Sequence, residues 1–144
     1  MKLILLFLLL MSILPVATPY SPFRGRGYPR DCPGCTGYTA WRGLPADPWN
    51  SAGVRIMAVD PKVLKLGRCY DVRFIDPDNL KPGHTTLYLA ADIGGDIKGR
   101  RTDFLMKSRK SMKQFGVQDV APGDPVACPK SWLAWIEKNA RRKK

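Results

Sequence analysis

The stretch Asp92-Ile93-Gly94-Gly95-Asp96-Ile97-Lys98-Gly99-Arg100-Arg101-Thr102-Asp103 holds two aspartates at its ends and a Gly-Gly pair between them. The residues before it, Thr85 to Ala91, are β-branched and apolar, which predicts a buried strand that ends at Asp92. The two glycines permit a tight turn and let a ligand approach the backbone. The flanking carboxylates are the groups that glycoside chemistry uses as proton donor and charge partner, although Asp and Gly at a turn are more often only turn formers.

A third aspartate, Asp60, lies upstream in Met57-Ala58-Val59-Asp60-Pro61, and Leu64-Lys65-Leu66-Gly67 follows it. Together with Asp92 to Gly99 and Asp103, these segments resemble the three-aspartate "3D" domain. Membrane-bound lytic transglycosylase A shares that domain with the stationary-phase-survival and resuscitation-type cell-wall proteins. The resemblance runs over residues 36–120, from Thr39-Ala40-Trp41, similar to an opening strand, to the segment after Phe115-Gly116. The chain departs from the family pattern at three positions: Ile93, Asp96 and Thr102.

The resemblance implies a mainly β fold, a small six-stranded double-psi β-barrel whose aspartates face one groove. The sequence itself adds one short helix and a C-terminal helical extension. It also implies a lytic transglycosylase that cleaves the β-1,4 bond between N-acetylmuramic acid and N-acetylglucosamine. We expect this enzyme to be secreted and to need no cofactor or metal. Asp103 matches the family's catalytic aspartate and would serve as the single acid and base. Asp92 and Asp60 would orient the loop and stabilise developing charge, although a structural hydrogen bond is the favoured interpretation of Asp60. The implied substrate contacts are Gly94, Gly95, Lys98 and Trp41. For Trp41, a place in the core or in the groove wall is favoured over a role as a platform for a sugar ring.

The pKa of Asp103 must be raised if this carboxyl is to start the reaction protonated. Asp92 or Asp60 would raise it through like-charge repulsion, whereas Lys98 and Arg101 would lower it. The sequence does not decide which influence is larger.

Several short strands and one short helix are predicted from periodicity and turn signals, a combination that favours a closed barrel. The expected helix spans Ser108 to Phe115, with Ser108 as its N-cap and Gly116 at its end. The expected strands span residues 54–59, 69–74, 85–91, 103–106 and 117–120, with a further one through Thr36 to Trp41.

Four segments divide the 144 residues. Residues 1–18 begin with Met1-Lys2 and an apolar run, typical of a signal peptide or, if uncleaved, an anchor, which predicts a secreted, periplasmic or envelope-associated protein. Residues 19–34 are rich in Pro, Gly and Arg and are expected to be a linker. The barrel domain is assigned to residues 35–128 and a basic amphipathic helix and tail to residues 129–144.

The four cysteines form an even set in an exported small domain, which favours disulfides. Three pairings are conceivable, and we expect Cys32 to pair with Cys35 and Cys69 with Cys128. A redox Cys-x-x-Cys motif or a four-cysteine zinc site is the alternative, but zinc ribbons usually supply two close pairs. His84 follows Pro82-Gly83 and is expected to lie exposed in a hairpin loop.

The formal charge is +12, concentrated between Lys98 and Lys113 and in the terminal Arg141-Arg142-Lys143-Lys144. Such a surface attracts anionic polymers, although a solvated basic face is the plainer interpretation. Because export is expected, the predicted partners are peptidoglycan glycan strands, anionic envelope polymers or a membrane surface, and no nucleic acid is expected.

The C-terminal helix after Pro129 carries Trp132, Trp135, Ile136 and Ala140 on one face and Ser131 as a suitable N-cap, so we expect it to dock on the barrel. Two functions stay open beside the transglycosylase. One is a non-catalytic wall-binding module of the expansin type, also a double-psi barrel. The other is a basic envelope or nucleic-acid-binding scaffold, whose binding would depend on salt and not on Asp103.

Overall fold

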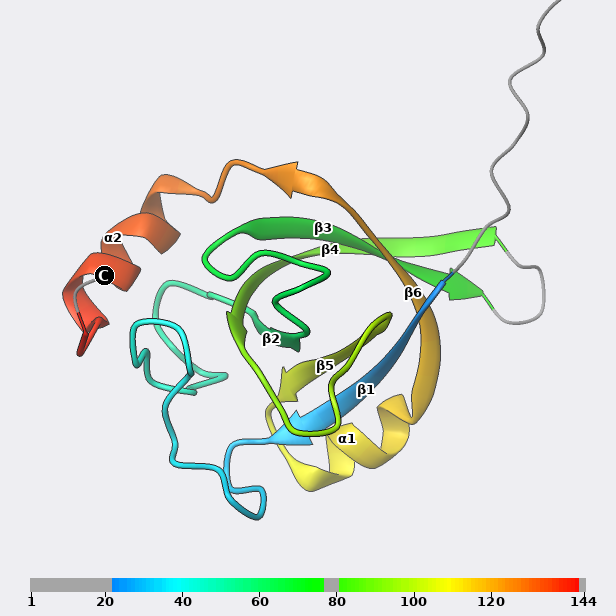
Figure 1. Cartoon of the computed structure of the whole chain (residues 1–144), viewed down its shortest axis with the longest axis horizontal. Helices are drawn as coiled ribbons and strands as arrows, with labels where there is room; N and C mark the ends of the chain where they lie inside the picture. The colour runs from blue at the N-terminus through cyan, green and yellow to red at the C-terminus, as the bar shows by residue number, and fades with distance from the viewer. Residues whose placement is uncertain (1–21, 77–80, 143–144) are drawn as a thin grey trace, which may run out of the picture.

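The computed structural model describes residues 22–76 and 81–142, which form six strands in one sheet and two helices (Figure 1). The expected signal peptide or anchor lies outside the described residues. Helix α1 spans Arg109–Phe115 and helix α2 spans Lys130–Asn139. The strands are β1 (Phe23–Pro29), β2 (Ile56–Val59), β3 (Cys69–Asp76), β4 (Lys81–Asp92), β5 (Arg101–Met106) and β6 (Val117–Val126).

The sheet closes on itself, because β6 pairs with β1 as well as with β3. The strand order is β1-β5-β2-β4-β3-β6, a closed barrel in which every strand has two hydrogen-bonded neighbours. Two pairs, β1 with β5 and β2 with β4, are parallel, and the other four are antiparallel. Closure pairs every strand on both sides over part of its length, although residues 81–88 of β4 pair with β3 alone.

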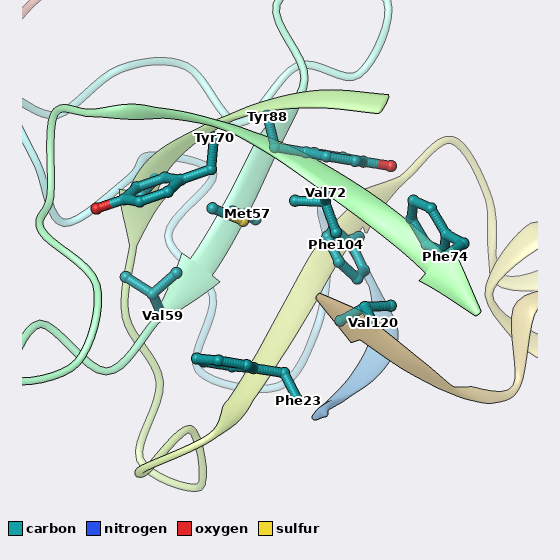
Figure 2. Packing of buried hydrophobic residues seen from close by; sticks show 10 residues of the cluster. Phe23, Met57, Val59, Tyr70, Val72, Phe74, Tyr88, Phe104 and Val120 are labelled. Carbon is teal, nitrogen blue, oxygen red and sulfur yellow. The ribbon is translucent and has the colours of Figure 1, made fainter. Parts of the chain in front are cut away.

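The interior of the barrel is filled by alternate residues of the six strands, which point inward at the period of two that a strand imposes. The aromatic rings interlock: Phe104 lies 4.6 Å from Tyr88 and 5.5 Å from Phe74 between ring centroids. Figure 2 shows these side chains converging from different strands. The cluster consists of Phe23, Met57, Val59, Tyr70, Val72, Phe74, Tyr88, Ala90, Phe104 and Val120.

A second apolar cluster joins helix α2 to the outside of the barrel, as the sequence predicted. Trp132 and Ile136 are buried there against Leu89 and Leu44. The predicted disulfide between Cys69 and Cys128 ties the start of β3 to the segment before α2, and the predicted Cys32–Cys35 disulfide is also present. The predicted cap at Ser131 is wrong: α2 begins at Lys130, and Pro129 occupies the N-cap position without a side-chain hydrogen bond.

The segment expected to be a linker contributes the first strand of the barrel. Phe23–Pro29 pairs with β5 on one side and β6 on the other, so the linker assignment is wrong for these residues. The glycines that suggested a linker are needed for close packing instead. A Cβ atom on Gly25 would lie 2.9 Å from a ring carbon of Phe104, and one on Gly27 would lie 2.7 Å from the side chain of Met106.

The strand expected from Thr36 to Trp41 does not form, and a single bridge joins Tyr38 to Pro45. Thr39 is buried and exchanges hydrogen bonds with Leu44 across a turn that passes through Arg42 and Gly43, both with positive φ. The local hydrogen bonds of Thr39 thus hold this stretch as a loop.

Two smaller expectations have opposite outcomes. Helix α1 is capped as predicted: the Ser108 hydroxyl accepts a hydrogen bond from the Ser111 amide, and Gly116 ends the helix with a φ of 63°. His84 lies within β4 and not in a hairpin loop, and its ring stacks on Phe74 at 4.4 Å, although the residue is exposed as expected.

Neither helix in residues 22–76 and 81–142 is long and apolar enough to cross a membrane.

Candidate functional site

A cleft of about 570 Å³ lies between the loop after β4, strand β5 and the Cys32–Cys35 segment. Ala58, Tyr28 and Arg101 also line it. Most of the residues singled out in the sequence lie in its wall: Asp92, Gly94, Gly95, Lys98 and Asp103. Asp60 and Trp41 are not among the lining residues.

Asp92 and Asp103 lie on the two strands that flank β2. Ala58 pairs with Asp103 of β5 and with Asp92 of β4, so both aspartates lie beside one small residue. The neighbours of Asp103 in β5, Thr102 and Phe104, are fully buried, which leaves the alternate residue Asp103 to face outward.

A β-bulge gives Asp92 the same outward direction. The register between β2 and β4 shifts from Met57 opposite Ala90 to Ala58 opposite Asp92, so Ala91 is the extra residue. Ala90 faces the barrel interior, and strict alternation would have turned Asp92 inward as well. The carbonyl of Ala91 accepts a hydrogen bond from the Trp41 amide at 2.9 Å. Bulges often re-aim side chains in this way, and this one places Asp92 on the face that carries Asp103.

Asp103 is a largely buried carboxylate of the cleft with few polar contacts. Its side chain is only 13% exposed, and its Oδ1 atom has no hydrogen-bond partner among the described residues. The Nε atom of Arg101 lies 3.6 Å from this oxygen, which is too long for a hydrogen bond. Burial raises the pKa of Asp103; the positive charges of Arg101 and Arg26 oppose this increase, and the negative charge of Asp96 adds to it. The main cause is therefore desolvation, and the like charge comes from Asp96, not from Asp92 or Asp60 as expected.

Asp92 is held by three hydrogen bonds. Its Oδ1 atom accepts from the amides of Ala40 and Ile93, each at 3.0 Å. Its Oδ2 atom accepts from the Tyr28 hydroxyl at 3.1 Å. The carboxylate therefore joins β1, the loop at Ala40 and the start of the Gly94-Gly95 turn.

Tyr28 is a cleft residue that sequence reasoning missed, because it fell in the expected linker. The pKa of its hydroxyl is raised well above the usual value, first by burial and then by the negative charges of Asp92 and Asp103. The hydroxyl consequently stays protonated and acts as a donor. The signal that could have located β1 is the alternation of Phe23, Gly25 and Gly27, which are the residues of this strand that pack inward.

Asp60 directly follows β2 and is 8% exposed. It binds the loop between β4 and β5 at Gly99, near the start of β5. Its carboxylate accepts hydrogen bonds from the Lys62 amide at 3.0 Å and the Gly99 amide at 2.8 Å. These two bonds are the main reason that the pKa of Asp60 is lowered. The geometry agrees with the favoured interpretation of Asp60 as a structural residue, and its contact with Gly99 orients the loop from outside the cleft.

Trp41 packs away from the cleft. Its ring covers Gly67, where a Cβ atom would lie 2.7 Å from the indole, and it packs against the cluster beneath α2. Lys98 is exposed at the cleft. Among residues 22–76 and 81–142, no group of three or more His, Cys, Asp and Glu side chains is arranged to hold a metal ion.

Comparison with known proteins gives two matches. The family described as the 3D domain matches residues 55–121, which include β2 to β5, α1 and the first half of β6. The SPbeta prophage-derived uncharacterized protein YorM of Bacillus subtilis (strain 168) is 34% identical over 105 residues, which make up 73% of this chain. The chain spans 38% of the length of that relative. Both Asp92 and Asp103 lie within the matched family segment, whereas Tyr28 precedes it.

Proposed function

Since the chain contains a 3D domain, we propose that it acts on the cell wall, as a lytic transglycosylase that cleaves peptidoglycan glycan strands. The observation that supports this activity best is the contrast among the three aspartates. Asp60 and Asp92 are engaged by hydrogen bonds, whereas Asp103 has a raised pKa and an oxygen that accepts no hydrogen bond from the described residues. One carboxyl group that can be protonated in a cleft suits a reaction that uses a single acid and base.

In the proposed reaction Asp103 first acts as an acid. It donates its proton to the oxygen that links C1 of N-acetylmuramic acid to N-acetylglucosamine, and the bond from C1 to that oxygen breaks. The resulting carboxylate then takes the proton of the muramyl 6-hydroxyl while O6 bonds to C1, which closes a 1,6-anhydro ring. No water is consumed, and Asp103 ends the cycle protonated. Desolvation supports the first step because it favours the neutral carboxyl.

The other residues of the cleft would position the loop and the sugar. Asp92 and Tyr28 are joined by a hydrogen bond and line the same cleft as Asp103, and in the proposed reaction the negative charge of Asp92 would stabilise the developing positive charge. Gly94 is packed tightly on Ile97, whereas a Cβ atom on Gly95 would meet open space. Gly95 and Lys98 are therefore the positions of the loop at which a glycan could lie against the protein.

We also infer that the barrel is of the double-psi type and that the protein works outside the cytoplasm. The two parallel pairs, β1 with β5 and β2 with β4, support the first inference because each requires a crossover within a small barrel. The two disulfides support the second, because such bonds persist in oxidising compartments.

A wall-binding module that does not cleave is the second candidate. The ion pair between Arg101 and Asp103 favours it, because a nearby guanidinium opposes protonation of the carboxyl. Such a protein would keep its affinity for the wall when Asp103 is replaced.

Mass spectrometry of soluble products separates these functions. Purified peptidoglycan is incubated with the wild type, with Asp103→Asn, and with Asp124→Asn, a matched change of an exposed aspartate outside the cleft. We expect anhydromuropeptides from the wild type and from Asp124→Asn but not from Asp103→Asn. Products with reducing ends would instead indicate a hydrolase. No products, with protein still pelleting on the wall, would establish the binding module.

A further inference from the structure

A second hollow, of about 330 Å³, adjoins the cleft that holds Asp92 and Asp103, which we call the acid cleft. The residues that line both are Tyr28, Gly34, Cys35, Asp92 and Ile93. The hydrogen bond from Tyr28 to Asp92 therefore lies in a wall that the two hollows share. A ligand held beside Asp103 would have to cross this wall to reach the second hollow.

The second hollow is cationic. Arg30 and Arg142 line it, and Arg142 also lines an adjoining hollow of about 420 Å³ together with Arg141 and Tyr38. In the part of the chain that the structure describes, none of these three arginines lies within ion-pair distance of a carboxylate. The acidic residue of the lining, Asp92, already accepts three hydrogen bonds.

The acids closest to these arginines in the sequence are paired elsewhere. Asp31, next to Arg30, lies 3.5 Å from Arg109, and Glu137 lies 2.7 Å from Arg42. Neither acid makes an ion pair with Arg30 or Arg142.

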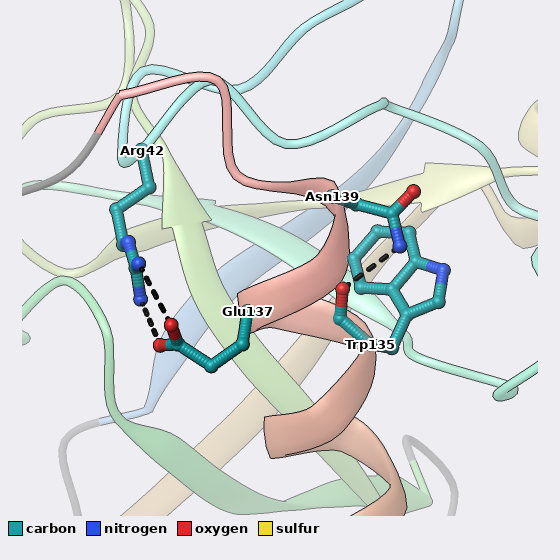
Figure 3. A network of polar contacts seen from close by, with 4 residues as sticks. All are labelled: Arg42, Trp135, Glu137 and Asn139. Carbon is teal, nitrogen blue, oxygen red and sulfur yellow. Dashed lines mark hydrogen bonds and ion pairs between the residues drawn. The ribbon is translucent and has the colours of Figure 1, made fainter.

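Arg142 is fixed in place. The amides of Arg141 and Arg142 donate to the carbonyl of Arg42 at 3.0 and 3.1 Å. Figure 3 shows the guanidinium of Arg42 in turn bound by Glu137 of α2. The guanidinium of Arg142 donates to the carbonyl of Ala40, and the amide of Ala40 donates to Asp92. The same loop thus positions both the end of the described chain and the Asp92 carboxylate.

We propose that Arg30 and Arg142 form a carboxylate-binding subsite that takes the peptide branch of a glycan strand held in the acid cleft. The nature of the glycan rests on the proposed function. A guanidinium group matches a carboxylate with two parallel hydrogen bonds, and two such groups suit a branch that ends in or carries carboxylates. A covalently attached branch is favoured over a separate polymer, because this hollow is small and shares five lining residues with the cleft.

Calorimetric titration with two soluble glycan fragments tests the subsite. One fragment keeps its peptide branches, and the other is the same fragment after an amidase has removed them. Both are titrated into Asp103→Asn, so that neither is consumed, and into two further variants in that background. The first variant is Arg30→Gln with Arg142→Gln. The control is Lys113→Gln with Lys138→Gln, which removes the same charge from exposed helical positions outside both hollows.

We expect Asp103→Asn to bind the peptide-bearing fragment on the order of tenfold more tightly than the stripped one, as one or two charge-assisted hydrogen bonds would give. The double arginine variant should lose this preference, and the double lysine control should keep it. Equal affinity of Asp103→Asn for the two fragments, or a preference that survives in the arginine variant, would overturn the subsite.

The cleavage assay described above is scored separately. If tighter binding of the peptide-bearing fragment depends on the two arginines but the wild type cleaves no peptidoglycan, the transglycosylase proposal is refuted and the subsite is supported. Cleavage with equal affinities would remove the subsite alone, and no cleavage by the wild type together with no binding of either fragment would remove both.

Discussion

The hydroxyl of Tyr28 donates to the Oδ2 atom of Asp92 over 3.1 Å and so links the first strand of the barrel to the end of β4. The two residues are 64 positions apart in the sequence. This bond lies in the wall common to the acid cleft and the hollow lined by Arg30 and Arg142.

Removing the Tyr28 hydroxyl should weaken both the fold and the site. Tyr28→Phe leaves one oxygen of a partly buried carboxylate without its donor, and we expect a loss of about 1–2 kcal/mol in the free energy of unfolding. Urea denaturation measures this loss. Tyr38→Phe, a matched change at an exposed tyrosine, should alter stability by less than about 0.5 kcal/mol. A Tyr28→Phe variant as stable as the wild type would contradict the interpretation.

Asp103 should destabilise the fold at neutral pH. Its pKa is raised in the folded state, so the folded protein binds more protons than the unfolded chain at pH values between the two pKa values. Stability from this group is therefore present below the unfolded pKa of about 3.9 and is lost as the pH rises through the folded pKa. We expect Asp103→Asn to be more stable than the wild type at pH 7. Denaturant unfolding curves of both proteins at pH 3.5 and pH 7 check this. A stability gain of Asp103→Asn that is equal at the two pH values would show that the pKa of Asp103 is not raised in the folded state.

Asp60 should show the opposite dependence on pH. Its folded pKa is lowered, so its contribution is present above the unfolded pKa and is lost as the pH falls through the folded value. Asp60→Asn removes the negative charge and should weaken the hydrogen bond that the Gly99 amide donates to this side chain at 2.8 Å. Hydrogen exchange followed by NMR should show a lower protection factor for Gly99. The Gly67 amide, which donates to Ala90, serves as an internal reference and should not change.

Gly25 and Gly95 offer a matched pair of alanine substitutions. A Cβ atom on Gly25 would press on Phe104 and Val120, so we expect Gly25→Ala to cost about 1–3 kcal/mol through overpacking. Gly95 faces open space without a positive φ, so Gly95→Ala should leave the melting temperature nearly unchanged. Thermal unfolding compares the two, and equal shifts would show that Gly25 is not packed as described.

The regular parts of the fold could be predicted from the sequence because their signals are local. Strands such as β3 and β4 carry apolar and β-branched residues, and α1 carries a serine cap and a terminal glycine. Strand β1 could not be recognised in this way. Its glycines resemble those of a linker, and their role becomes clear only from their packing on Phe104 and Met106 of β5. That strand lies far along the chain: Arg24 of β1 pairs with Arg101 of β5, 77 residues later.

The candidate site was only partly visible in the sequence for a related reason. The spacing of Asp92 and Asp103 pointed to one loop, and both residues lie in one cleft. The β-bulge at Ala91, which turns Asp92 outward, depends on register with β2 and leaves no local pattern. The main cause of the raised pKa of Asp103 is burial in the folded cleft. Burial cannot be read from the charged residues that lie near Asp103 in the sequence.

Ring closure by β1 has a consequence for where this domain can be cut. The matched family segment begins at residue 55, after β1 has ended, yet β1 lies between β5 and β6. A fragment trimmed to that segment would expose the backbone of both strands along the seam and would lose Tyr28 with it. The smallest fragment that keeps the closed barrel must therefore include β1, so it must begin at or before Phe23.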